Sequence, residues 1–476
     1  MNDKYTSPLS KRYAGEEMQR LFSEDKKFRT WRKLWIALAE SQMELGLNIT
    51  EEQIQQMKDN MDNINYEVAE AKEKEIRHDV MSHIHAFGKQ CPDAKGIIHL
   101  GATSCFVGDN TDLILMKEGL LLVRKKLVNT IKLLSDFAME YKDLPTLGFT
   151  HFQPAQPTTV GKRATLWIED LLLDLEYLEF VLSTLKLRGA KGTTGSQASF
   201  MELFDGDGEK VKQLDQKISE KLGFEGTYPV TGQTYSRKVD FQVLQVLSGI
   251  AQSAYKFSND VRLLAHMKEI EEPFEKSQVG SSAMAYKRNP MRSERMASIA
   301  RFIIADSINP ALNTTGQWLE RTLDDSANRR LSIPEGFLAT DGLLSLYINV
   351  ADGLVVYPKV IEKHLQEELP FMATETILME GVKRGGDRQV LHESIRKHSL
   401  ATAESIKVYG NENNLVERLG NDPEFNMTES EIWDMIKPER FIGRSVQQVE
   451  EFVQGEVKAI LDRYSEDLGM DVTISV

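Results

Sequence analysis

The sequence predicts an all-α protein with a central bundle of long helices. Apolar residues recur at steps of three and four from Leu113 to Leu134 and again from Val243 to Leu264. This spacing places them on one face of a helix, and each helix would be more than ~30 Å long at 1.5 Å per residue. Patterns typical of strands are rare elsewhere. Helices of this length suit shallow crossing angles, so we expect the two stripes to form the core of a bundle.

The region before the bundle predicts shorter helices. Residues 28–43 and 51–71 carry apolar side chains at helical spacing. Residues 46–48 separate the two segments, and Thr50 stands in the N-cap position of the second one.

Two more stretches predict bundle helices. They span residues 164–186 and 294–309, and Pro310 is expected to end the second because proline interrupts a helix. Residues 189–208 are rich in Gly, Ser and Thr and predict a loop, with a short hairpin near residues 192–208.

The order of these segments predicts three domains. We expect an N-terminal helical domain at residues 1–103, a central long-helix domain at 104–357 that contains a substrate loop at 279–292, and a smaller helical domain at 358–476. The last boundary falls at Tyr357-Pro358, beyond which glycines divide the chain into shorter helices.

Composition limits the classes of function. The 476 residues carry a net charge of −14, which argues against nucleic acid as a partner because duplex binding needs a positive field. No stretch approaches the roughly 18 apolar residues that span a bilayer, and the first residues show no apolar run after a basic start. The two cysteines form no CxxC motif and no disulfide framework. We therefore expect a soluble cytoplasmic protein without a membrane or nucleic-acid partner.

Histidines cluster between residues 77 and 99, which contain four of the nine in the chain. In a helix, His78 and His85 would share one face, and Asp79 and His83 another. A metallohydrolase using His78, His83 and His85 is therefore an alternative. The spacing is not HExxH, and no acidic cluster completes a ligand shell. No dinucleotide or P-loop motif is present, so we expect no metal and no organic cofactor.

The stretch VGSSAMAYKRNP, residues 279–290, interrupts the helical pattern with a polar and cationic segment. Gly280 permits a turn, Ser281 and Ser282 offer hydroxyls, and Lys287 and Arg288 offer positive charge. From residue 276 to 295 five Lys or Arg stand against one Glu. A solvated basic loop is the simpler interpretation, but the neighbouring hydroxyls favour a loop that binds an anionic substrate.

His151 lies in a second irregular segment, GFTHFQPAQP, whose glycine and prolines exclude a regular helix. A histidine held between two long helices is well placed as a proton donor because its free pKa is near ~6.5. A lone histidine can equally be structural.

A family resemblance joins these segments. The stretch 279–290 resembles the GSSxMPxKxNP signature of the fumarase/aspartase superfamily, and its YKRNP ending is similar to that of the adenylosuccinate lyase family. It departs at Ala285, where the family has proline, which leaves one more rotatable φ in the loop. The resemblance continues over essentially the whole chain, at residues 7–13 (SPLSKRY), 77–80 (RHDV), 98–104 (IHLGATS), 150–163 (THFQPAQPTTVGKR) and 321–330 (RTLDDSANRR).

The resemblance implies catalytic roles. Ser281 matches the general base and His151 the general acid. The serine must be activated by its surroundings, and Lys287 is the candidate whose charge would favour the alkoxide and bind a carboxylate. His78 and His99 match positions that contact substrate and assist the acid, and Glu294 matches one that tunes a histidine.

The resemblance also implies positions that bind the nucleotide phosphate or the succinyl carboxylates. Arginine forks and hydroxyls suit both groups. These positions are Arg12, Tyr13, Arg77, His78, Asp79, His99, Thr103, Ser104, Gln233, Lys287, Asn289, Arg295, Arg321, Ser326 and Arg330. Arg329 is expected to be structural, because adjacent arginines cannot both point one way.

The implied reaction is an anti β-elimination that releases fumarate, from adenylosuccinate to give AMP and from the succinylocarboxamide ribotide (SAICAR) to give the aminoimidazole carboxamide ribotide (AICAR). The resemblance also implies a homotetramer with sites shared between subunits. Two alternatives stay open beside the metallohydrolase: a sibling fumarate-releasing lyase of the argininosuccinate or aspartate type, and a purely structural helical scaffold.

Overall fold

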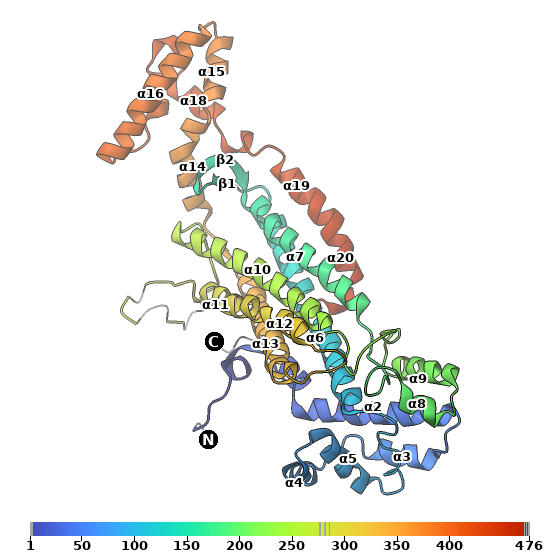
Figure 1. Cartoon of the computed structure of the whole chain (residues 1–476). Helices are drawn as coiled ribbons and strands as arrows, with labels where there is room; N and C mark the ends of the chain where they lie inside the picture. The colour runs from blue at the N-terminus through green and yellow to red at the C-terminus, as the bar shows by residue number, and fades with distance from the viewer. Residues whose placement is uncertain are drawn as a thin grey trace.

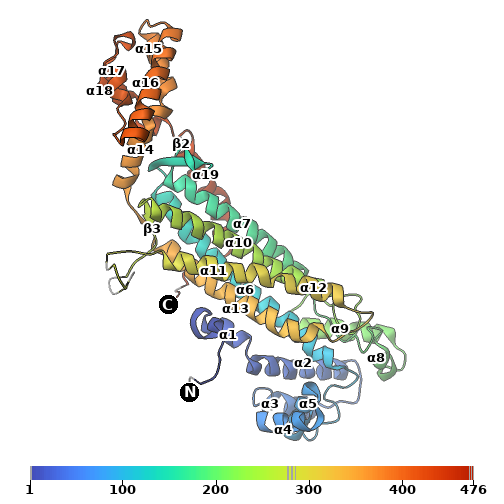
Figure 2. The ribbon, with the colours of Figure 1, turned by 60° about the vertical axis from the view of Figure 1, so that its left-hand side comes forward.

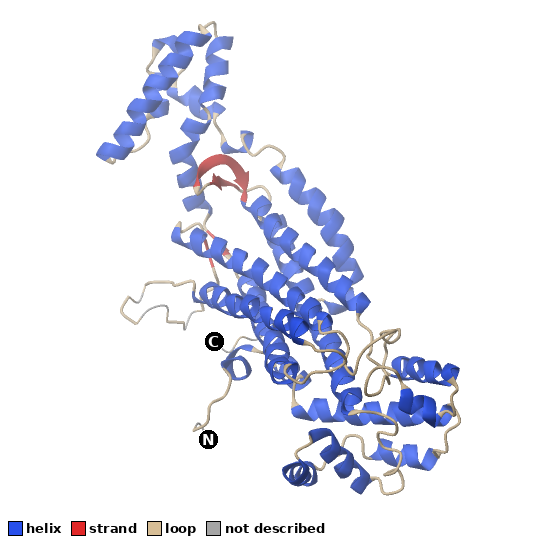
Figure 3. Cartoon of the chain, viewed as in Figure 1, coloured by secondary structure: helices blue, strands red, loops and turns tan. Residues whose placement is uncertain are grey.

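The structure, a computed structural model, describes residues 3–275, 278–279, 282–284, 286–470, 472 and 474. Within these residues no helix is both long and apolar enough to cross a membrane. Figure 3 shows helices throughout, with short strands at one end of the bundle. The predicted all-α fold class is confirmed.

Five long helices form the central bundle (Figure 1). They are α6 (Ser104–Glu140), α7 (Val160–Thr184), α10 (Lys238–His266), α11 (Met291–Asp306) and α13 (Asp325–Asp352). They pack in neighbouring pairs, α6 on α7 and α13, and α10 on α7, α11 and α13. Leu113, Leu134, Val243 and Leu264 at the ends of the predicted stripes are all buried, so both helix predictions are confirmed.

The break after α11 differs from the prediction. Helix α11 ends at Asp306, and α12 (Ile308–Gly316) begins two residues later with Pro310 in its first turn. Proline is tolerated there because the first backbone N–H groups of a helix have no acceptor within it. Pro310 therefore does not end the bundle helix as expected.

Eight further helices of the described part of the chain lie toward the lower end of the bundle in Figures 1 and 2, and all but α2 are short. They are η1 (Leu9–Tyr13), α1 (Glu16–Leu21), α2 (Glu24–Glu44), α3 (Glu51–Asp59), α4 (Tyr66–Ile76), α5 (Asp79–Gln90), α8 (Ala198–Leu203) and α9 (Gly208–Lys221). Thr50 accepts a hydrogen bond from the Gln53 amide in a capping box, as predicted.

The single helix expected over residues 51–71 is wrong, because the chain turns between α3 and α4. The buried guanidinium of Arg32 donates hydrogen bonds to the carbonyls of Asn60 and Asn63, which removes them from helical pairing. Asn65 then caps α4 by accepting from the Val68 amide.

The strands form two small antiparallel pairs. β1 (Pro145–Thr150) and β2 (Gln153–Thr159) make a hairpin at the upper end of the bundle, and β3 (Ile270–Glu271) pairs with β4 (Val355–Val356) beside it. The hairpin expected near residues 192–208 is wrong, because residues 198–203 form α8.

The C-terminal part divides between two cores. A separate apolar core runs from Ala373 to Ile436, whereas Val449 and Val457 belong to the main core. The helices of this C-terminal part are α14 (Pro358–Met372), α15 (Thr374–Lys383), α16 (Arg388–Tyr409), α17 (Leu415–Gly420), η2 (Pro423–Phe425), α18 (Glu429–Met435), η3 (Pro438–Arg440), α19 (Ser445–Phe452), η4 (Val453–Val457), α20 (Lys458–Arg463) and η5 (Ser465–Asp467). The last helices return along α6 and α7, so the segment 358–476 expected as one domain contributes to both cores.

Candidate active site

A cleft of about 760 Å³ opens at the lower end of the bundle. Helices α2, α4 and α5, the start of α6, the loop before α10 and the start of α13 supply its walls. Eight of the predicted binding residues line it: Arg77, His78, Asp79, Ser104, Gln233, Arg321, Ser326 and Arg330. They come from four separate stretches of the sequence, at residues 77–79, 104, 233 and 321–330, and the fold brings them together.

One wall of the cleft is a chain of polar contacts across α5, α6 and α13. His78 caps α5, with Nδ1 accepting from the Met81 amide at 3.4 Å. With Nδ1 as acceptor, Nε2 carries the proton and donates to Ser104 Oγ at 3.2 Å. On the next residue, Asp79 Oδ2 lies 3.3 Å from Arg330 Nη2. These contacts fix the direction in which each side chain faces the cleft.

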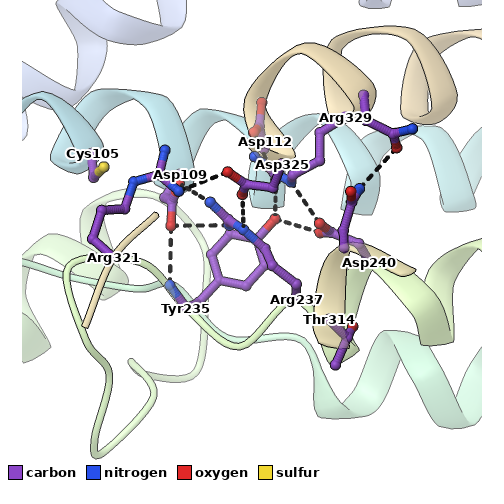
Figure 4. A network of polar contacts seen from close by, with 12 residues as sticks. Cys105, Asp109, Asp112, Tyr235, Arg237, Asp240, Thr314, Arg321, Asp325 and Arg329 are labelled. Carbon is purple, nitrogen blue, oxygen red and sulfur yellow. Dashed lines mark hydrogen bonds and ion pairs between the residues drawn. The ribbon is translucent and has the colours of Figure 1, made fainter. Parts of the chain in front are cut away.

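The floor of the cleft is a buried network of arginines and carboxylates (Figure 4). Arg237 donates to both carboxylate oxygens of Asp109 at 3.2 Å and to Asp325 at 2.7 Å. Arg321 donates to the other oxygen of Asp325 at 2.8 Å. The cations beside it lower the pKa of Asp325 against the opposing effect of burial. The network therefore keeps Asp325 ionised and holds Arg321 at the cleft.

Arg329 belongs to the same floor. Its guanidinium donates to Asp240 at 2.6 Å and to the Tyr235 hydroxyl at 2.6 Å, and lies 2.9 Å from Asp112. Arg329 is 8% exposed, whereas the side chain of Arg330 is 66% exposed. The two neighbours therefore point in different directions, and the structural role expected for Arg329 agrees with its pairing.

Two residues whose role the sequence did not predict shape the cleft. Arg237 anchors the floor, and Lys27 of α2 lies in the wall near Arg330. Arg237 falls in the TGQTYSR segment that also contains Gln233, but nothing in that string separates a buried anchor from a surface arginine. Lys27 lies in an ordinary amphipathic helix.

Four predicted residues lie near this end of the molecule but do not line the cleft. Arg12 and Tyr13 lie in η1, which packs against α13 near Gly342. His99 Nδ1 accepts from Trp35 Nε1 at 2.8 Å, and burial lowers the His99 pKa to about 4, so this ring is neutral with its proton on Nε2. Thr103 is the N-cap residue of α6 and makes no side-chain cap hydrogen bond.

His151 lies at the tip of the β1–β2 hairpin. It is exposed and has a φ of 53°, and Phe152 beside it has a φ of 56°. Both values fall in the left-handed region, which non-glycine residues adopt rarely, so the two-residue turn holds a strained backbone. The side chain of His151 projects from a rigid element into solvent within this chain.

The predicted substrate loop lies beside β3. Gly280, Ala285 and the predicted base, Ser281, fall outside the described residues. Lys287 is exposed, and its amide donates to the Met284 carbonyl at 3.0 Å.

The loop ends where α11 begins, and Asn289, Glu294 and Arg295 lie at that junction. Glu272 accepts from the amides of Arg292 and Ser293 at 2.9 and 2.8 Å, which anchors the helix start. Glu294 is exposed on the first turn of α11.

One chain therefore presents three separated groups of candidate residues. Helix α6 begins at the cleft with Ser104 and ends at Glu140, five residues before the hairpin. Its 37 residues span ~55 Å at 1.5 Å per residue. Figures 1 and 2 both show the hairpin at the upper end of the bundle, with α2 and α5 at the lower end. His151 cannot reach the cleft of its own chain.

The proposed metal ligands do not converge. His83 is buried and stacks on Phe28 at a centroid distance of 3.7 Å, and burial lowers its pKa to about 4. Within the described residues, no group of three or more His, Cys, Asp or Glu is arranged to hold a metal ion. The metallohydrolase alternative is not favoured.

Comparison with known proteins defines the class. The family profile described as "Lyase" matches residues 6–305, and the profile described as "Adenylosuccinate lyase C-terminus" matches residues 370–452. A solved structure of a 3-carboxy-cis,cis-muconate lactonizing enzyme from Pseudomonas putida has the same fold. It gives a TM-score of 0.81 at 20% identity over 95% of this chain and 99% of that one.

Full-length relatives define the family within this class. The chain is 54% identical over 469 residues to an adenylosuccinate lyase of Saccharomyces cerevisiae, covering 98% of this chain and 97% of the relative. It is 51% identical to one from Schizosaccharomyces pombe, with 96% and 95% covered, and 49% identical to one from Schistosoma mansoni, with 100% and 99% covered. The chain belongs to the adenylosuccinate lyase family.

The floor network predicts a large stability effect. Arg237→Met should lower the free energy of unfolding by about 3–5 kcal/mol, because it leaves Asp109 and Asp325 buried without their shared cation. Arg396→Ala is the control, since it breaks a solvent-exposed pair with Glu393 that is expected to contribute little to stability. Urea denaturation compares the two, and equal midpoints would show that the network does not support the floor.

Proposed function

We propose that this protein is an adenylosuccinate lyase that cleaves adenylosuccinate to AMP and fumarate, and SAICAR to AICAR and fumarate. The observation that carries the proposal is the cleft, in which four separate stretches that match the family place arginines and hydroxyls around one space. Both substrates carry a phosphate and a succinyl group with two carboxylates. Arginine forks bind both kinds of anion.

The proposed chemistry is an elimination without redox change. Ser281, as the alkoxide, removes the proton from the carbon beside a succinyl carboxylate, and the electron pair delocalises into that carboxylate. Lys287 stabilises the charge that grows there. The C–N bond then breaks, and His151 donates a proton to the departing nitrogen. Fumarate leaves, and proton exchange with water restores both side chains.

The cleft residues are assigned to binding. Arg321 in the loop before α13 and Ser326 in its first turn, together with Arg330, face a space bordered by Arg77 and His78. In this proposal they hold the anionic groups, and Gln233 and Ser104 supply neutral hydrogen-bond partners. Arg321 arrives already oriented by Asp325, which reduces the entropy lost on binding.

We also propose a homotetramer in which subunits complete each other's sites. The hairpin lies too far from the cleft for one chain to bring His151 to it. The bundle also exposes an apolar stripe on α7, with Leu166, Leu173, Tyr177 and Phe180 between 37% and 58% exposed. A stripe of this kind marks an association surface. The tetramer is proposed to act on nucleotides in the cytoplasm.

Fumarate absorbance tests the proposed reaction. Wild-type protein mixed with adenylosuccinate should release fumarate, and His151→Ala and Ser281→Ala should each reduce kcat by ~10²–10⁴-fold, the usual contribution of a positioned proton-transfer group. Ser282→Ala is the matched control and should keep near-normal turnover. A large loss in Ser282→Ala with normal Ser281→Ala would contradict the assignment of the base.

Subunit exchange tests the shared site. The inactive variants His151→Ala and Ser281→Ala, mixed one to one, should regain about a quarter of wild-type activity, because each group is intact in about half of the chains. Native mass spectrometry of isotopically labelled chains checks that exchange has occurred. Complete exchange with no recovered activity would place the acid and base on one chain.

A further inference from the structure

Lys27 is a cation of the cleft that the family resemblance did not assign. It lies in the first turn of α2, between Glu24 and Trp31 along the same helix face, and all three line the cleft. Its ammonium lies 4.9 Å from the ring centroid of Phe28 and 5.0 Å from that of Trp31. These aromatic contacts orient the side chain before any ligand arrives.

Three of the arginines that line the cleft with Lys27 have carboxylate partners. Arg237 and Arg321 share Asp325, and Arg330 contacts Asp79. Lys27 differs from them, because its ammonium has no ion pair or hydrogen bond within the described part of the chain. The carboxylates of Glu24, Asp79 and Asp112 act on it only from a distance.

Arg330 is the one cation among the described charged groups that act on Lys27. Burial, and next the nearby charge of Arg330, lower the pKa of Lys27. An anion placed between these two cations stabilises both of them. A single carboxylate matches one arginine fork, whereas a phosphate dianion calls for more than one cation.

We propose that Lys27 binds the phosphate of the nucleotide together with Arg330. This inference rests on the proposed function, because it takes the ligand to be a nucleotide monophosphate. A lysine suits the role as a compact point charge with three donors that can follow the tetrahedral phosphate oxygens. Lys27 is thus a further substrate-binding residue, contributed by α2 to a cleft whose other cations lie at the end of α4, at the start of α10, and in or just before α13.

Calorimetric titration with AMP and with adenosine tests the proposal. Lys27→Gln should weaken AMP binding roughly tenfold, in line with the loss of one charge-assisted hydrogen bond, and leave adenosine binding unchanged. Lys27→Arg keeps the charge and should bind AMP within a few-fold of the wild type. If Lys27→Gln fails to fold, Lys27→Met serves as the test instead. It removes the charge but keeps an apolar side chain against the rings of Phe28 and Trp31.

Lys26→Gln is the matched control. Lys26 is the neighbouring residue, but it pairs with Glu118 at 2.7 Å and does not line the cleft. Its loss should leave AMP affinity unchanged. Unchanged AMP affinity in Lys27→Gln, or an equal loss for AMP and adenosine, would overturn the phosphate role.

The outcomes separate the two proposals. Wild-type protein that binds AMP but releases no fumarate would refute the proposed reaction, while the Lys27 titrations would still decide the phosphate contact. Wild-type protein that does not bind AMP would overturn both.

Discussion

The length of α6 is the constraint on which the arrangement of the candidate site depends. The helix starts at the cleft and ends just before the hairpin that carries His151, so its 37 residues keep the two ~55 Å apart. Its buried apolar stripe holds it straight within the bundle. A structure with rigid helices of this length cannot fold one end onto the other. Any chemistry that needs both ends requires a second chain.

The cleft itself depends on a balance of buried charge. Asp109 and Asp325 neutralise Arg237, and Asp240 and Asp112 neutralise Arg329, so the floor is rigid and its cations are already paired. The side chain of Arg330 is far more exposed, and Lys27 has no carboxylate partner within the described residues. The buried network therefore supports the shape of the cleft, while Arg330 and Lys27 present positive charge to it. The adjacent residues Arg329 and Arg330 differ in both burial and partners.

The sequence predicted the features that local pattern controls. The stripes from Leu113 to Leu134 and from Val243 to Leu264 predicted the long helices, because a helix with one buried face needs apolar residues at steps of three and four. The turn after α3 was missed because Arg32, nearly thirty residues earlier, binds the carbonyls that a helix would use. Lys27 was missed for the same reason: its neighbour Arg330 lies some three hundred residues away. Contacts made only in the folded chain leave no local signal.

The distance from the hairpin tip of one chain to the cleft rim of another tests whether the site is shared between subunits. One pool of protein carries a spin label in place of Phe152, which is 55% exposed at the hairpin tip, and a second pool carries one in place of the exposed Glu73 at the cleft rim. After exchange, double electron–electron resonance reports only pairs on different chains. If subunits share the site, the two labels should lie at a separation well below the ~55 Å length of α6. A mixed sample whose shortest separation matches or exceeds that length would contradict a site shared between subunits.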